Sequence, residues 1–285
     1  MTDRSALLIS TDELAARLEL GDPRLVIVDA SWYLAAMGRD AAAEFAAERI
    51  PGAVHFGIDE ICDKTSPLPH MLPTAAGFAA AVGALGIAEN ADIVVYDRMG
   101  LFSAPRVWWH LAVYGAKSVR ILDGGLPKWK GEGRPMETGA PRIPAPATFT
   151  VRIDTGRIAD LDAVVGVLGD GSATVVDARP VERFRGEAPE PRPGMRAGHM
   201  PGAKSVPFAS VVADGRLAEA AAIRAAFAAV DLDRPIVTSC GSGVSAAILW
   251  LALEAIGVPR GRLALYDGSW SEWGSSSATA VVTGA

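Results

Sequence analysis

The sequence predicts an α/β protein made of two tandem copies of one domain, each a parallel sheet flanked by helices. Three observations support this prediction: a repeated set of landmarks, short β-branched segments that alternate with helical patterns, and a proline-containing segment between the two copies. The chain of 285 residues has room for about two domains of ordinary size. Half of its residues are hydrophobic, so both domains can bury a core.

Four landmarks occur in the same order in both halves of the chain. They are an apolar segment with Asp-Ala, a Pro-Gly-Ala turn, a second apolar segment, and an Asp-Gly segment that contains tryptophan. The first half places them at 25–32, 49–56, 93–104 and 119–129, and the second half at 173–180, 199–208, 236–246 and 263–273. Chance similarity at four ordered places is improbable, so we interpret the chain as a duplication.

Residues 137–149 separate the two copies and contain three prolines. Such a segment is typical of an extended, rather stiff linker. We therefore expect an N-terminal domain at 1–138, a linker at 139–150 and a C-terminal domain at 151–285.

Short apolar segments and helical patterns alternate along each copy. In chain order we predict a helix at 11–20 with Ser10 or Thr11 as N-cap, strands at 25–29, 93–97 and 119–123, a helix at 100–115 with its tryptophans facing the core, and a helix at 223–230. Strands that alternate with helices favour one parallel sheet in each domain. In such sheets the ligand crevice lies at the carboxyl ends of the strands.

The composition excludes several classes of protein. The net charge of -6 argues against a basic nucleic-acid-binding face. Only two cysteines are present, too few for a disulfide framework, which favours a reducing compartment. The first residues lack the pattern of a secretory signal, and no run reaches the ~18 apolar residues of a membrane span. We expect a cytoplasmic protein with no nucleic-acid or membrane partner.

The stretch S-C-G-S-G-V-S-A-A at 239–247 lies between an apolar strand and a helical pattern. Cys240 is thus predicted at the carboxyl end of a strand. A free thiol has a pKa of about 8.5, so a reactive thiolate needs stabilisation. Gly241 and Gly243 allow the backbone to curl and direct N–H groups at the sulfur, and a helix that begins near Val244 adds its positive end.

The alternative is a small residue at a tight turn, with glycines present for steric reasons alone. The first copy has Asp97 where the second has Cys240. Both copies keep the turn and the following helix, so the turn itself does not need a cysteine. This favours a functional thiol in the second copy only.

With these residues the chain resembles the tandem-domain rhodanese family of sulfurtransferases over nearly its whole length. The resemblance rests on the P-G-A turns at 51–53 and 201–203, the segments D-G-G-L-P-K-W and D-G-S-W-S-E-W, and the cysteine loop. In that family the first domain is silent and the second carries the nucleophile, which matches Asp97 and Cys240.

The loop C-G-S-G-V-S resembles that of the 3-mercaptopyruvate sulfurtransferase branch. Thiosulfate-specific members have Arg and Lys after the cysteine. Ser245 stands where the branch usually has Thr, and it keeps the hydroxyl. Positions 245–247 are Ser-Ala-Ala, whereas the related phosphatase loop ends in Arg, so the sequence speaks against phosphoryl transfer.

The resemblance implies that Arg183 and Arg192 bind the substrate carboxylate. Guanidinium suits this task, because it is always charged and binds carboxylate bidentately. The alternative is that they are ordinary solvated arginines, since the segment 179–196 contains five.

The resemblance also implies that Asp59, His70 and Ser242 form a Ser-His-Asp arrangement for proton transfer, which requires a site between the two domains. The alternative for His70 is a structural role. Cys62, three residues after Asp59, is expected to be an inert buried thiol, the alternative being a redox-sensitive neighbour of the site.

The expected function is transfer of sulfur from 3-mercaptopyruvate through a Cys240 persulfide to a thiol or cyanide, with release of pyruvate. The N–H groups of Gly241, Ser242, Gly243, Val244 and Ser245 are implied to hold the outer sulfur. We expect no metal and no organic cofactor, and a thioredoxin-like protein is one candidate acceptor. Two alternatives stay open: a thiosulfate sulfurtransferase, and a module that carries a persulfide to a partner without turnover.

Overall fold

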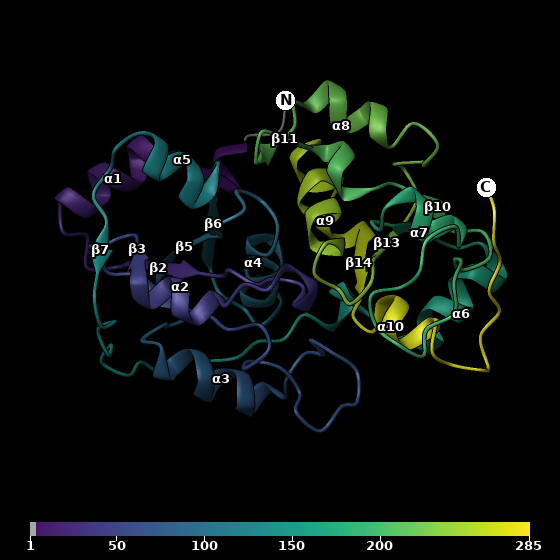
Figure 1. Cartoon of the computed structure of the whole chain (residues 1–285), viewed down its shortest axis with the longest axis horizontal. Coiled ribbons are helices and arrows are strands. Elements are labelled where there is room, and N and C mark those ends of the chain that lie inside the picture. The colour runs from purple at the N-terminus through teal and green to yellow at the C-terminus, as the bar shows by residue number, and fades with distance from the viewer. Residues whose placement is uncertain (1–3) are drawn as a thin grey trace.

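The computed structural model describes residues 4–285, which form two five-stranded parallel sheets and two short antiparallel strand pairs (Figure 1). The first sheet has the order β1-β6-β5-β2-β4, and the second has the order β8-β14-β13-β9-β10. Position by position the second sheet repeats the first, so the prediction of duplicated parallel α/β domains is confirmed.

The strands of the first sheet are β1 (Leu8–Ile9), β2 (Leu25–Asp29), β4 (Val54–His55), β5 (Asp92–Tyr96) and β6 (Ser118–Leu122). Those of the second are β8 (Ile158–Ala159), β9 (Thr174–Asp177), β10 (Lys204–Ser205), β13 (Ile236–Ser239) and β14 (Leu263–Tyr266). The antiparallel pairs are β3 (Glu48–Arg49) with β7 (Glu137–Thr138), and β11 (Val212–Ala213) with β12 (Arg216–Leu217).

The helices are α1 (Thr11–Glu19), α2 (Ala41–Ala47), α3 (Ala75–Ala84), α4 (Ala104–Val113), α5 (Gly125–Gly131), α6 (Leu161–Asp170), α7 (Val181–Arg185), α8 (Ala220–Ala226), α9 (Ala246–Ala255) and α10 (Ser269–Trp273). Within residues 4–285, no helix has the length and apolar character needed to cross a membrane.

The helix predictions were right in kind and inexact at the ends. α1 begins at Thr11 with Ser10 as N-cap, whose hydroxyl accepts from the N–H of Glu13. α4 begins at Ala104 rather than at 100, because the preceding loop wraps around the carboxylate of Asp97. α9 likewise begins two residues later than the sequence suggested, at Ala246.

The central strands of both sheets bring the two matched positions to the same kind of edge. Asp97 directly follows β5, and Cys240 directly follows β13. Each of these strands is paired with parallel strands on both sides and is largely buried, as its apolar sequence requires. Both residues therefore lie at the carboxyl edge of a sheet, where α/β proteins bind ligands.

Helices α4 and α9 pack against each other where the two halves of the molecule meet (Figure 1). Every residue of α9 is buried, and the ring of Trp250 lies 6.2 Å from that of Trp109 in α4. A helix that is apolar on all sides belongs in an interior. One hydrophobic cluster therefore runs through both halves and fixes the loops of one sheet against those of the other.

Residues 139–154 contain neither helix nor strand and lead from the first sheet to the second. The domain limits at 138 and 151 stay a prediction.

Candidate active site

The thiol of Cys240 is 2% exposed and lines a cavity of about 260 Å³ between the two halves of the chain. The loop carbonyls of Cys240 and Gly241 accept hydrogen bonds from Trp270 and Ser271 of α10. Within residues 4–285, the N–H groups of residues 241–245 donate to no acceptor. These five groups, which precede the N-terminus of α9, can hold an anion at the sulfur of Cys240.

The equivalent loop of the first sheet shows what such N–H groups bind. The carboxylate of Asp97 is buried and accepts hydrogen bonds from the N–H groups of Met99 (2.9 Å), Phe102 (2.7 Å), Ser103 (2.9 Å) and Ala104 (2.9 Å). This loop is therefore an anion nest filled by the protein's own carboxylate, so it has no place for a ligand. In the second sheet the thiol of Cys240 takes that place.

Replacing Asp97 with asparagine should destabilise the protein. Three of the four N–H donors share Oδ2, which the amide oxygen can replace, but the amide NH2 group then faces the N–H of Met99. A buried unpaired donor costs about 1–3 kcal/mol, so we expect the free energy of unfolding, measured in urea, to fall by about that amount. Asp123→Asn is the control: within residues 4–285 no N–H group donates to this half-buried carboxylate, so the amide leaves no donor unpaired there. Equal stability of Asp97→Asn and wild type would refute the nest.

Ser242, His70 and Asp59 form a hydrogen-bonded chain across the interface. Nδ1 of His70 lies 3.0 Å from Oγ of Ser242, and its Nε2 lies 3.0 Å from Oδ1 of Asp59. An ionised carboxylate only accepts, so Nε2 carries a proton. In the neutral imidazole Nδ1 then accepts from the serine hydroxyl, and in the imidazolium it can donate to the carbonyl of Ser242, 3.2 Å away. The arrangement implied by the resemblance is thus assembled by segments far apart in sequence.

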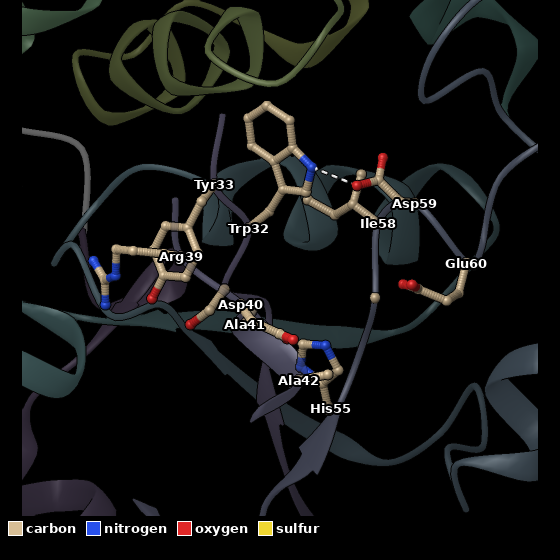
Figure 2. Close-up of a pocket in the computed structure, with 12 residues that line it drawn as sticks. Trp32, Tyr33, Arg39, Asp40, Ala41, Ala42, His55, Ile58, Asp59 and Glu60 are labelled. Atoms are coloured by element: carbon tan, nitrogen blue, oxygen red, sulfur yellow. Dashed lines mark hydrogen bonds between the residues drawn. The ribbon is translucent and has the colours of Figure 1, made fainter. Parts of the chain in front are cut away.

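Trp32 completes the surroundings of His70 and Asp59. Its Nε1 donates to Oδ2 of Asp59 at 2.8 Å (Figure 2), and its ring meets that of His70 edge to face at 4.9 Å. Trp32 and Asp59 also wall an adjoining pocket of about 280 Å³ on the side of the first sheet. The tryptophan therefore fixes the carboxylate and the imidazole together.

The hydrogen bond from His70 lowers the pKa of Asp59 below its ordinary value. A depressed carboxyl pKa adds stability that is present above the unfolded value of about 3.9 and is lost as the pH falls through the lower folded value. Since 59% of the side chain is exposed, solvent screens the effect to less than about 1 kcal/mol. In urea titrations, wild type should exceed Asp59→Asn in stability at pH 5, and this advantage should shrink as the pH is lowered below about 3.9. An advantage that grew at pH 3 would contradict this sign.

The two predicted carboxylate ligands differ in their partners. Arg183 donates to the buried carboxylate of Glu190, and its guanidinium lies against Gly241 of the cysteine loop. Arg192 forms no hydrogen bond or ion pair with any residue of 4–285, and it lines both the Cys240 cavity and the adjoining cavity of His70. Burial lowers the pKa of Arg192, and the nearby carboxylate of Asp59 partly offsets this effect. Arg192 is therefore the open cation of the site.

Several residues of the site escaped the sequence analysis. Glu190 pairs with both Arg183 and the buried Arg179, and Arg179 also binds Asp177. The signal in the sequence was the position of Glu190 within the arginine-rich segment 179–196, which indicates an ion-pair partner for these arginines. Cys62, expected to be buried, is a correction: it is partly exposed, and its thiol donates to the carbonyl of Asp59 at 3.1 Å.

Comparison with known proteins places this geometry in a family. The sequence matches the description "Rhodanese-like domain" twice, over residues 10–132 and 160–276. The chain belongs to the rhodanese family. The predicted family resemblance is thereby confirmed, and each matched region of this rhodanese contains four of the five strands of one sheet.

Similar proteins extend the comparison over most of the rhodanese chain. It is 42% identical over 272 residues to a 3-mercaptopyruvate sulfurtransferase of Escherichia coli strain K12, with 94% of each chain covered. It is 43% identical over 258 residues to the human 3-mercaptopyruvate sulfurtransferase, which covers 89% of this chain and 86% of the human one. The crystal structure of SseA from Escherichia coli, described as a 3-mercaptopyruvate sulfotransferase of rhodanese fold, has a TM-score of 0.85 at 38% identity and covers 93% of this chain and 99% of its own.

Proposed function

We propose that this rhodanese is a 3-mercaptopyruvate sulfurtransferase that carries sulfur as a persulfide on Cys240. The observation that carries the proposal is a buried thiol beside N–H groups that have no acceptor within residues 4–285, in one cavity with the open cation Arg192 and beside the Ser242–His70–Asp59 chain. Relatives with this name and about 40% identity over most of the chain support it.

The charges around the cavity suit a monoanion. Arg179 and Arg183 pair with the carboxylates of Asp177 and Glu190, whereas Arg192 has no ion-pair partner within residues 4–285 and can bind one carboxylate. The carboxylate of 3-mercaptopyruvate supplies one negative charge, and thiosulfate carries two. Arg192 binds this carboxylate directly, with Arg183 beside it.

The first half-reaction begins with proton transfer. The Cys240 thiol gives its proton through Ser242 to His70, and Asp59 stabilises the resulting imidazolium. The thiolate attacks the substrate sulfur, so that an S–S bond forms and the C–S bond breaks. The electron pair of that bond leaves as pyruvate enolate, which recovers the proton from His70 through Ser242. The products are pyruvate and a Cys240 persulfide whose proton comes from the substrate thiol.

In the second half-reaction an acceptor removes the outer sulfur. The free N–H groups of residues 241–245 stabilise the persulfide anion until a thiol or cyanide attacks it, and the Cys240 thiolate leaves. Splitting the transfer into two displacements requires no other carrier of sulfur. We further propose a small thiol or a thioredoxin-like protein as acceptor, and a reducing, cytoplasmic setting in line with the two free cysteines.

The purified protein should turn over 3-mercaptopyruvate with a small thiol or cyanide at a kcat/KM at least about tenfold above that for thiosulfate, because the open cation Arg192 suits a single carboxylate. Pyruvate and sulfite release measure the two reactions. A preference for thiosulfate would contradict 3-mercaptopyruvate as the sulfur donor and would leave Cys240 as the proposed nucleophile. A single round of sulfur uptake without turnover would favour the carrier module instead.

A further inference from the structure

Arg106 of α4 is the most enclosed charge near the site, with its side chain fully buried. Its Nη2 donates to the carbonyl of His70 at 2.8 Å, and the same nitrogen forms an ion pair with Asp267, which follows β14 of the second sheet. Its Nη1 reaches toward the carbonyl of Gly243 in the cysteine loop at 3.4 Å. One guanidinium thus contacts the backbones on both sides of the His70–Ser242 hydrogen bond.

Asp267 holds the same loop from the opposite side. Its second carboxylate oxygen accepts from the N–H of Leu72 at 2.8 Å. The carbonyl of His70 and the N–H of Leu72 are therefore both fastened, one by Arg106 and the other by Asp267. Because the backbone is held on both sides of Met71, the loop has little freedom to rotate there.

The backbone at both contact points is unusual in a way that fits this role. His70 has φ of 63°, a left-handed conformation that costs a non-glycine residue about 1–3 kcal/mol and persists only where neighbours hold it. Gly243 has φ of 81°, and a Cβ there would lie 2.7 Å from Nη1 of Arg106. The glycine of the cysteine loop therefore makes room for this guanidinium.

We propose that Arg106 and Asp267 form a positioning clasp that sets the imidazole of His70 against Ser242. The expected effect on kcat rests on the proposed function, whereas the expected effect on the position of the His70 imidazole rests on geometry alone. Neither residue lines the Cys240 cavity, so the clasp acts through His70 and not on the substrate. Without it the strained His70 relaxes, and the proton relay across the interface loses its alignment.

The decisive comparison is between Arg106→Met and the double variant Arg106→Met/Asp267→Asn. Removing only the arginine leaves a buried carboxylate without a partner, which is strongly destabilising, whereas removing both charges can be close to neutral. Asparagine keeps an acceptor for the N–H of Leu72. We expect the double variant to regain most of the melting temperature lost in Arg106→Met.

In the double variant, kcat for 3-mercaptopyruvate should stay about 10- to 100-fold below wild type with KM changed less than about threefold, because the relay is misaligned while Arg192 is intact. Discharge of a preloaded Cys240 persulfide by cyanide should be unchanged, since that step does not use His70. Return of kcat together with stability would show a merely structural pair and overturn the clasp.

Arg49→Met/Glu137→Gln is the matched control, because Arg49 is also a buried arginine with a carboxylate partner. It should leave kcat at the wild-type level.

A second readout is independent of turnover. The imidazole ¹⁵N spectrum, with His70 assigned by its loss in His70→Asn, should show the Nε2–H tautomer in wild type and a tautomer mixture in the double variant. A spectrum that is the same in wild type and the double variant would overturn the clasp. Failure of wild type to take up sulfur from 3-mercaptopyruvate would overturn the proposed function, and the spectrum alone would then decide whether the clasp exists.

Discussion

Replacing Cys240 with serine should reduce pyruvate release from 3-mercaptopyruvate by at least about 10³-fold, because the carrier of the sulfur is removed. A serine hydroxyl cannot form the S–S bond of the intermediate, and it ionises far less readily than a thiol. The change is nearly isosteric in a residue that is 2% exposed, so the fold should persist. Pyruvate formed per enzyme, with a thiol acceptor in excess, is the measurement.

Cys62→Ser is the matched control for this experiment. It removes the other thiol of the chain, and a hydroxyl can still donate to the carbonyl of Asp59 as the thiol does. We expect activity within about twofold of wild type, as for other substitutions outside the reacting groups. Loss of activity in Cys62→Ser, or more than a tenth of it remaining in Cys240→Ser, would place the nucleophile elsewhere.

Replacing Arg192 with glutamine should lower kcat/KM for 3-mercaptopyruvate by about 100-fold, mainly through KM. Hydrogen bonds to a charged partner contribute about 1.5–3 kcal/mol each, and Arg192 is the open cation of the cavity. Arg192→Lys should recover part of the loss, because it restores the charge but not the bidentate fork.

The control for Arg192 is Arg185→Gln. This arginine belongs to the same segment, is exposed, and lines a pocket that contains neither Cys240 nor residues 241–245. It should leave kcat/KM unchanged. If Arg185→Gln and Arg192→Gln had equal effects, general electrostatic attraction would explain the binding better than a specific contact.

The repeat and the strands were predictable because they depend on local pattern. The segment 25–29 was predicted as a strand and is β2, and Cys240 was placed at a strand end, where it lies. The start of α4 was misjudged because the apolar residues Leu101 and Phe102 extend the apolar pattern of the helix. In the structure the N–H groups of Phe102 and Ser103 donate to the carboxylate of Asp97, and the loop that makes these contacts is not helical.

The contacts that complete the site were beyond local pattern. Arg106 and Asp267 meet across 161 residues of sequence, and Trp32 reaches Asp59 from a different loop. Asp267 belongs to a repeated landmark, yet its counterpart Asp123 only shows that the turn recurs. Nothing in the spacing of residues tells which charged side chains become partners once two sheets are packed together.

The most direct test of the central claim is the intact mass of the protein after incubation with 3-mercaptopyruvate and no acceptor. The proposal predicts a gain of one sulfur atom in wild type, no gain in Cys240→Ser, and loss of the added sulfur when cyanide is supplied. No gain in wild type, or the same gain in Cys240→Ser, would contradict a persulfide on Cys240 as the carrier of sulfur.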